Sequence, residues 1–224
     1  MRILIISGHG GTPYDSGAIG NGYKEAELTR ELAKLVVAKL KQYATVDLYD
    51  ISKDAYKECK KGTFSIGSYD YVLELHFNSS ANKSAQGTEI YVTPREAGIG
   101  VEQEIMDKLS KHFKVRGVKR DDFLVINTVK SKSISSALLE TCFISNASDM
   151  KMYQVNKNKI AQDIVNGIAI GFGLTSTKRY HVVQKGDTLY SIARQYNVNI
   201  TDLVKLNNIK NANLITIGHV IYLT

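Results

Sequence analysis

Short apolar runs alternate with amphipathic helical stretches over residues 1–174, and this alternation restricts the possible folds more than any other feature of the chain. The runs are rich in β-branched or aromatic residues, as buried strands are. Strands that alternate with helices pair side by side and are covered by those helices. We therefore predict an α/β fold with a twisted, mostly parallel sheet flanked by helices. The predicted strands cover residues 2–7, 46–51, 69–77, 87–93, 123–128 and 138–144.

Three of the intervening stretches repeat apolar residues at helical spacing. This spacing gives each predicted helix one apolar stripe that can pack on a sheet. The stripes consist of Leu28, Leu32, Leu35, Val36 and Leu40, of Val101, Ile105, Leu109 and Phe113, and of Ile160, Ile164, Ile168 and Phe172.

The pattern changes after Leu174, where a short polar stretch without periodicity follows. We predict a first domain at residues 1–174, a linker at 175–179 and a second domain at 180–224. The second domain is predicted to be a βααβ unit, which is near the lower size limit for independent folding. Its elements are a strand at 180–184, a helix with Leu189, Ile192, Ala193 and Tyr196 on one face, a helix at 201–206 and a strand at 220–223.

The composition fits two structured units that work on a charged surface. With 224 residues, 43% of them hydrophobic, the chain can bury one ordinary core and a smaller one. The formal charge of +7 suits an anionic partner such as nucleic acid or cell wall. We predict no nucleic-acid partner, because the sequence lacks an Arg/Lys-rich helix and an aromatic stacking platform of the usual kinds.

The sequence also predicts where the chain is made. No apolar run approaches the length of about eighteen residues that a spanning helix needs, so we predict no membrane insertion. The apolar stretch at residues 1–6 is too short for a signal peptide. We therefore expect synthesis in the cytoplasm without a signal peptide. Cys59 and Cys142 form no disulfide framework and are predicted to be reduced thiols.

The second domain carries a specific motif around its first turn. Gly186 allows a tight turn, and Asp187 or Thr188 can accept hydrogen bonds from the free amides of the next helix. The motif consists of YHVVQKGDTLYSIA at residues 180–193, then Leu206-Asn207-Asn208, then Gly218. This segment resembles a LysM domain over its whole length. The resemblance implies binding of glycans that contain N-acetylglucosamine, in a groove formed by Gly186, Asp187, Thr188, Leu189, Asn211, Asn213, Leu214 and Ile215.

Polar residues near strand ends and at one helix start are candidates for a metal site, although each alone also has a structural explanation. His9 follows the first strand among glycines, which let the backbone and a ligand approach closely. Glu25 begins the first helix, where a carboxylate either binds a metal or stabilises the helix N-terminus. His76 lies near the exit of its strand, and alternation places Glu74 and Asn78 on the same face.

Glu140 interrupts an otherwise apolar strand, and no basic residue lies near it in the sequence. A buried carboxylate is costly unless it is paired or functional. Cys142 is expected on the same strand face as Glu140, and His112 is expected on the surface. Glu27 is an alternative to Glu25, but two residues along a helix rotate a side chain to roughly the opposite side, so only one of them can face a metal.

In chain order, these residues resemble the zinc-dependent N-acetylmuramoyl-L-alanine amidases over residues 1–174. The matching segments are Gly8-His9-Gly10-Gly11, Glu25 with Thr29, His76-Phe77-Asn78, and Glu140-Thr141 with Phe143 and Asn146. The resemblance implies one Zn²⁺ per catalytic domain, held by His9, Glu25 and His76, and a catalytic role for Glu140. Two imidazoles and one carboxylate are a common catalytic zinc set. Because metal-bound imidazoles usually need orienting partners, Glu74 and Asn78 either serve His76 in that way or form a solvated strand end.

The implied reaction is hydrolysis of the amide between the lactyl group of N-acetylmuramic acid and L-alanine, with bacterial peptidoglycan as the partner. The expected lack of a signal peptide favours a phage endolysin that reaches the wall after release through a holin. A bacterial autolysin or a sporulation amidase would use the same chemistry. Two further alternatives are a non-catalytic wall-binding protein and a zinc peptidase that cuts within the stem peptide.

Overall fold

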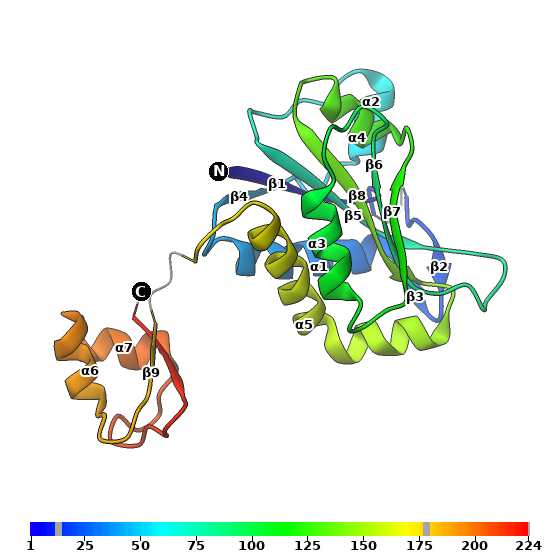
Figure 1. The fold of residues 1–224 in the computed structure, drawn as a ribbon. Coiled ribbons are helices and arrows are strands. Elements are labelled where there is room, and N and C mark those ends of the chain that lie inside the picture. The colour runs from blue at the N-terminus through cyan, green and yellow to red at the C-terminus, as the bar shows by residue number, and fades with distance from the viewer. Residues whose placement is uncertain (12–14, 177–179, 224) are drawn as a thin grey trace. The chain divides into compact units, whose positions relative to one another are not determined.

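The computed structural model describes residues 1–11, 15–176 and 180–223 of the chain (Figure 1). The chain divides between Leu174 and Thr175 into two units, and each unit has its own hydrophobic core. Part of the predicted linker, residues 177–179, lies outside the described residues. No helix in the described ranges has both the length and the apolar character to cross a membrane.

The first unit is built on a six-stranded sheet with the strand order β4-β1-β5-β8-β6-β7. All neighbouring strands pair in parallel except β6 and β8, which are antiparallel. This mostly parallel sheet with flanking helices confirms the predicted fold class. The strands are β1 Arg2–Ser7, β4 Thr45–Leu48, β5 Tyr71–Asn78, β6 Thr88–Val92, β7 Val115–Arg120 and β8 Ser135–Phe143.

Helices cover both faces of this sheet. Helices α1 (Glu25–Leu40), α3 (Gly100–Leu109) and α5 (Ala147–Gly171) pack on one face, and their apolar stripes are the three that the sequence predicts. The shorter helices α2 (Ala55–Lys61) and α4 (Leu124–Lys130) lie together on the other face (Figure 1). A small hairpin of β2 (Ile19–Gly20) and β3 (Tyr23–Lys24) precedes α1.

The strand predicted at residues 123–128 is wrong, because this segment forms α4. Its buried residues Val125, Ile126 and Val129 have helical spacing, but a run this short fits either type of element. The sixth strand is instead β7, whose sequence VRGVKR is largely polar. An edge strand is covered less than a central one and so lacks a strong apolar pattern.

The expected position of Cys142 is also wrong. The pairing of β5 with β8 is irregular, since His76 is opposite Glu140 but Asn78 is opposite Phe143. This shift turns Cys142 into the core on the side of α1 and α5, away from the face that carries Glu140. His112 is not simply a surface residue either: its side chain is 10% exposed, and its Nε2 lies 2.8 Å from Oδ2 of Asp163 in α5.

The second unit is the expected βααβ arrangement. Strands β9 (Tyr180–Val182) and β10 (Val220–Tyr222) pair antiparallel, and α6 (Leu189–Tyr196) and α7 (Ile200–Leu206) lie between them in sequence. Thr188 caps α6, because its Oγ1 accepts the Ser191 amide hydrogen at 3.0 Å. Asp187 instead accepts from the Gln184 amide at 2.7 Å and contacts His181. The core consists of Val183, Leu189, Ile192, Ala193, Leu203, Ile221 and Leu223.

Candidate metal centre and catalytic site

Three side chains from separate parts of the chain meet at one point of the first unit. His9 follows β1, Glu25 is the first residue of α1, and His76 lies near the end of β5. Glu25 Oε1 is 2.9 Å from Nδ1 of His76, and its Oε2 is 3.1 Å from Nε2 of His9. One ligand atom from each residue lies within 4.8 Å of the others. The three residues could therefore hold one metal ion, whereas the side chain of Glu27 is 65% exposed and points elsewhere.

The backbone around His9 is held in an unusual conformation. His9 has φ of 65°, in the left-handed region that residues other than glycine seldom adopt. Thr29 donates a hydrogen bond to the Gly8 carbonyl at 2.9 Å, and Arg30 Nη2 donates to the His9 carbonyl at 3.0 Å. Backbone outliers of this kind cluster at functional sites and persist because their surroundings hold them. Two side chains of α1 thus hold the backbone of Gly8 and His9 in place.

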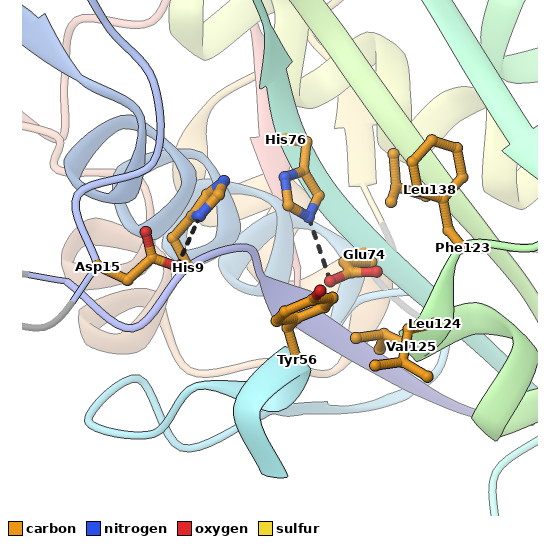
Figure 2. Close-up of a pocket in the computed structure, with 9 residues that line it drawn as sticks. All are labelled: His9, Asp15, Tyr56, Glu74, His76, Phe123, Leu124, Val125 and Leu138. Carbon is orange, nitrogen blue, oxygen red and sulfur yellow. Dashed lines mark hydrogen bonds and ion pairs between the residues drawn. The ribbon is translucent and has the colours of Figure 1, made fainter. Parts of the chain in front are cut away.

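Each imidazole also faces a second carboxylate on its other ring nitrogen. Nδ1 of His9 lies 2.9 Å from Oδ2 of Asp15, and Nε2 of His76 lies 3.1 Å from Oε1 of Glu74 (Figure 2). Carboxylates in this position fix the orientation and tautomer of metal-binding histidines. Glu74 thus lies where an orienting residue is expected, but Asn78 does not, because its amide donates to Glu89 at 2.7 Å.

Sequence reasoning missed Asp15 and Arg30. Asp15 stands in a glycine-rich loop, and its Oδ1 also accepts the Gly17 amide hydrogen at 2.9 Å. The sequence Asp-Ser-Gly at residues 15–17 is an ordinary turn signal, so it gave no indication of a contact with His9. Arg30 follows Thr29 on α1 and binds backbone carbonyls of His9 and Ile51, which are partners that no periodic pattern reveals.

The charges of the three residues are strongly coupled. Burial lowers the pKa of His9, but the hydrogen bond and charge of Glu25 raise it above its ordinary value overall. Burial likewise opposes the charged form of His76, yet Glu74 and Glu25 raise its pKa well above the usual range. Burial penalises ionised Glu25, but the two imidazoles hold its pKa far below the usual range. A metal cation bound between these groups would replace the two protons that the imidazole nitrogens facing Glu25 otherwise carry.

Glu140 lies next to this cluster. It is opposite His76 in the register of β5 and β8, and both side chains lie on the face of the sheet that α2 and α4 cover. Within the described parts of the chain, Glu140 Oε2 is buried and has no hydrogen-bond partner. Burial, together with the carboxylates of Glu25, Glu89 and Glu74 and against the charge of His76, raises the pKa of Glu140 to about 7. Such a group can accept and return a proton near neutral pH.

Comparison with known families decides which family this is. Residues 3–170 match the family described as N-acetylmuramoyl-L-alanine amidase. The chain belongs to this amidase family. Residues 181–224 match the LysM domain, so the second unit is a LysM domain.

Individual relatives of the amidase-family unit agree with this assignment. The N-acetylmuramoyl-L-alanine amidase LytC of Bacillus subtilis strain 168 is 36% identical over 174 residues, which cover 74% of this chain and 34% of LytC. The catalytic domain of the CD27L endolysin targeting Clostridia difficile has a TM-score of 0.65 and 26% identity, covering 76% of this chain and 97% of that domain. The catalytic domain of CwlV, an N-acetylmuramoyl-L-alanine amidase from Bacillus (Paenibacillus) polymyxa, has a TM-score of 0.63 and 25% identity, covering 78% of this chain and 100% of that domain. The matched part of this chain therefore spans only 34% of the length of LytC.

The amidase-family unit has a cavity of about 200 Å³ beside the candidate metal centre (Figure 2). One side of the cavity carries the polar groups His9, Asp15, Glu74 and His76. The other side is apolar and comes from α2, the start of α4 and β8. Its residues are Tyr56, Phe123, Leu124, Val125 and Leu138. Sequence reasoning did not predict this apolar side, because it assigned residues 123–128 to a strand.

In the LysM domain, the residues predicted to bind glycan differ in exposure. Gly186, Thr188, Asn211, Asn213 and Leu214 are exposed, and Leu214 is 72% exposed. Asp187 and Ile215 are partly buried. The side chain of Leu189 is buried in the domain core, which leaves only its backbone for contact with a glycan.

Proposed function

We propose that this chain is a zinc-dependent N-acetylmuramoyl-L-alanine amidase. It would hydrolyse the amide that joins the lactyl group of N-acetylmuramic acid to L-alanine of the stem peptide. The observation that carries the proposal is the meeting of His9, Glu25 and His76 within 4.8 Å, with Glu140 in register beside His76. Membership of the amidase family supports the choice of this amide over other bonds.

The donor set supports zinc as the metal. Two imidazole nitrogens and one carboxylate are a usual catalytic zinc set, which leaves one position open. Both imidazoles face the same carboxylate and are oriented from behind by Asp15 and Glu74, as a bound cation requires. When bound, Zn²⁺ supplies Lewis acidity, which lowers the pKa of water toward about 7 and polarises the amide carbonyl.

Glu140 would carry out the proton transfers of the reaction. Its Oε2, buried and without a partner among the described residues, would take a proton from the attacking water and pass it to the nitrogen of L-alanine as the amide breaks. A pKa near 7 suits both steps, because the carboxylate must first accept the proton and then release it. The apolar side of the cavity would limit access of other water to the reacting groups.

We propose that the LysM domain holds the enzyme on bacterial peptidoglycan through the segments 186–189 and 211–215. A single small module binds weakly, but its tether to the catalytic unit raises the local substrate concentration. We further propose that the chain is a phage endolysin that acts on the wall after release. A holin gene beside its own gene would support this assignment, and an export signal in the full gene product would favour an autolysin.

The test uses purified sacculi, metal analysis and product mass spectrometry. We expect one zinc per chain, chelator-sensitive loss of turbidity, and intact stem peptides with a free L-alanine amine. Fragments cut inside the stem would show a peptidase instead. Binding to sacculi without any release would support a non-catalytic wall-binding protein and overturn the amidase proposal.

A further inference from the structure

A second polar cluster lies on the face of the sheet that carries Glu140, toward the edge formed by β7. Glu89 of β6 is opposite Glu140 in the antiparallel register and is 2% exposed. Its Oε2 accepts hydrogen bonds from Nε of Arg116 at 2.6 Å and from the Lys119 ammonium group. Its Oε1 accepts from the Asn78 amide at 2.7 Å and the Tyr91 hydroxyl at 3.0 Å. Each carboxylate oxygen of Glu89 thus accepts two hydrogen bonds.

This cluster carries one positive charge more than it needs. Burial penalises ionised Glu89, but hydrogen bonds from Lys119 and Arg116 hold its pKa below the ordinary value, so the carboxylate is ionised at neutral pH. One carboxylate balances one of the two cations. The remaining charge lies at the surface, since the side chains of Arg116 and Lys119 are 35% and 37% exposed. A cluster that served only to neutralise Glu89 would require one cation.

Arg116 contacts Glu89 through one of its three guanidinium nitrogen atoms. This atom is Nε, and neither of the two Nη atoms donates a hydrogen bond within the parts of the chain that the structure describes. The guanidinium group lies over the ring of Phe143, with its carbon 5.0 Å from the ring centre, and Lys119 lies similarly over Tyr91. The pair of Nη groups is the part of arginine that matches a carboxylate with two parallel hydrogen bonds.

We propose that Arg116 and Lys119 bind the free carboxylate on the second residue of the stem peptide. This inference rests on the proposed amidase function, because it takes the stem peptide as the leaving group. The charged groups contact Glu89 and therefore lie over β6, about 4.8 Å from the strand of Glu140. One or two extended residues, at about 3.3 Å each, span this distance if the scissile amide lies beside Glu140, as the proposed function requires.

The charge of the site gives the reason for such a subsite. Glu25 and Glu74 are buried and Glu140 has a buried carboxylate oxygen, and all three would lie beside the scissile amide of an anionic peptide. Of the two products, the stem peptide carries the free carboxylates, whereas the muramoyl sugar gains one only when the amide is cut. Positive groups near Glu140 would therefore attract the stem peptide and offset its repulsion by the acidic side chains.

The test compares two synthetic muramoyl tripeptides that differ only at the second stem residue, which carries a free carboxylate or a carboxamide. For the zinc-loaded full chain we expect kcat/KM to be at least about tenfold higher for the carboxylate, as for one charge-assisted hydrogen bond. Lys119→Met and Arg116→Lys should each reduce this preference at least about threefold, with little change for the carboxamide. Lys34→Met, at an exposed position of α1, should leave the preference unchanged.

A binding measurement separates this inference from the amidase proposal. The Glu140→Gln protein is titrated calorimetrically with each tripeptide, so the readout does not require turnover. If neither substrate is cut by the wild-type chain, the amidase proposal fails, while the ratio of the two Kd values still tests the carboxylate subsite. Equal Kd values, or an equal preference in the wild-type chain and both variants, would overturn the subsite. Arg116→Lys keeps a cation beside Glu89, so a loss of preference in this variant would not result from an unbalanced buried carboxylate that misfolds the chain.

Discussion

Replacing Gly8 by alanine tests whether the candidate metal centre depends on close approach of the backbone to His76. A Cβ at position 8 would lie 2.3 Å from Cε1, 2.5 Å from Nε2 and 2.7 Å from Nδ1 of the ring. Non-bonded carbon atoms prefer about 3.5 Å, so the ring or the strand must move by roughly 1 Å. The ring is not free to turn away, because Nδ1 faces Glu25 and Nε2 faces Glu74.

A shift of this size should be visible in metal binding and in rate. Disturbed orientation of a ligand typically costs about 10–100-fold in metal affinity, and about 1 Å of misplacement costs about 100-fold in rate. We therefore expect Gly8→Ala to weaken zinc binding at least about tenfold and to lower kcat/KM about 100-fold. Overpacking should also lower the free energy of unfolding by about 1–3 kcal/mol.

The assay is competition for zinc with a chromophoric chelator, followed by hydrolysis of a soluble muramoyl peptide at saturating zinc. Gly98→Ala is the matched control, because a Cβ at position 98 would meet nothing within 4 Å. This control should bind zinc and turn over like the wild-type chain. A folded Gly8→Ala protein with wild-type zinc affinity would refute the reasoning, since His76 would then tolerate displacement without loss of the site.

Three further perturbations test other parts of the site. Glu140→Gln should retain zinc and lose at least about 100-fold in turnover, and full activity of the zinc-loaded variant would exclude Glu140 as the base. In the zinc-free protein, the same substitution should raise the free energy of unfolding at pH 8 but not at pH 4. Asp15→Asn and Glu74→Gln should each weaken zinc binding about 10–100-fold in chelator competition, with the exposed Asp50→Asn as control; unchanged affinity would contradict the orienting role. Removing zinc should abolish hydrolysis but not binding to sacculi in a pull-down assay, and loss of binding would place wall recognition in the amidase unit.

Local patterns indicate three of the four candidate site residues, and the family resemblance assigns these three a shared role with Glu25, which begins a helix as many carboxylates do. His9 ends an apolar strand, His76 stands near another strand end, and Glu140 interrupts an apolar run. The carboxyl ends of parallel strands meet at one edge of a sheet, so residues far apart in sequence can be expected to lie together there. Asp15 breaks no pattern, because its contact with His9 depends on the path of a loop.

The errors in the predicted fold have similar physical causes. The segment LVINTVK is a short apolar run, which fits a strand as well as a helix. Its packing beside α2 determines that it forms a helix. The edge strand β7 uses its polar residues Arg116 and Lys119 to contact Glu89, so the same residues hide its strand character and form the second polar cluster. The irregular register that turns Cys142 away from Glu140 depends on the pairing of two strands and cannot be derived from one.

The stability of the zinc-free protein should reveal the cost of burying Glu140. Raising its pKa from 4.5 to about 7 corresponds to about 3 kcal/mol, at about 1.4 kcal/mol per pKa unit. At pH 4 the carboxyl is mostly protonated in both folded and unfolded chains, so little of this cost applies. Between pH 4.5 and about 7 the unfolded chain releases the proton first, so stability falls as pH rises, and the full cost applies above pH 7. Glutamine stays neutral, so denaturant unfolding of Glu140→Gln should show a gain of up to about 3 kcal/mol at pH 8. No gain at pH 8 would mean that ionised Glu140 does not destabilise the folded chain. The argument that a destabilising carboxylate is retained for proton transfer would then lose its basis.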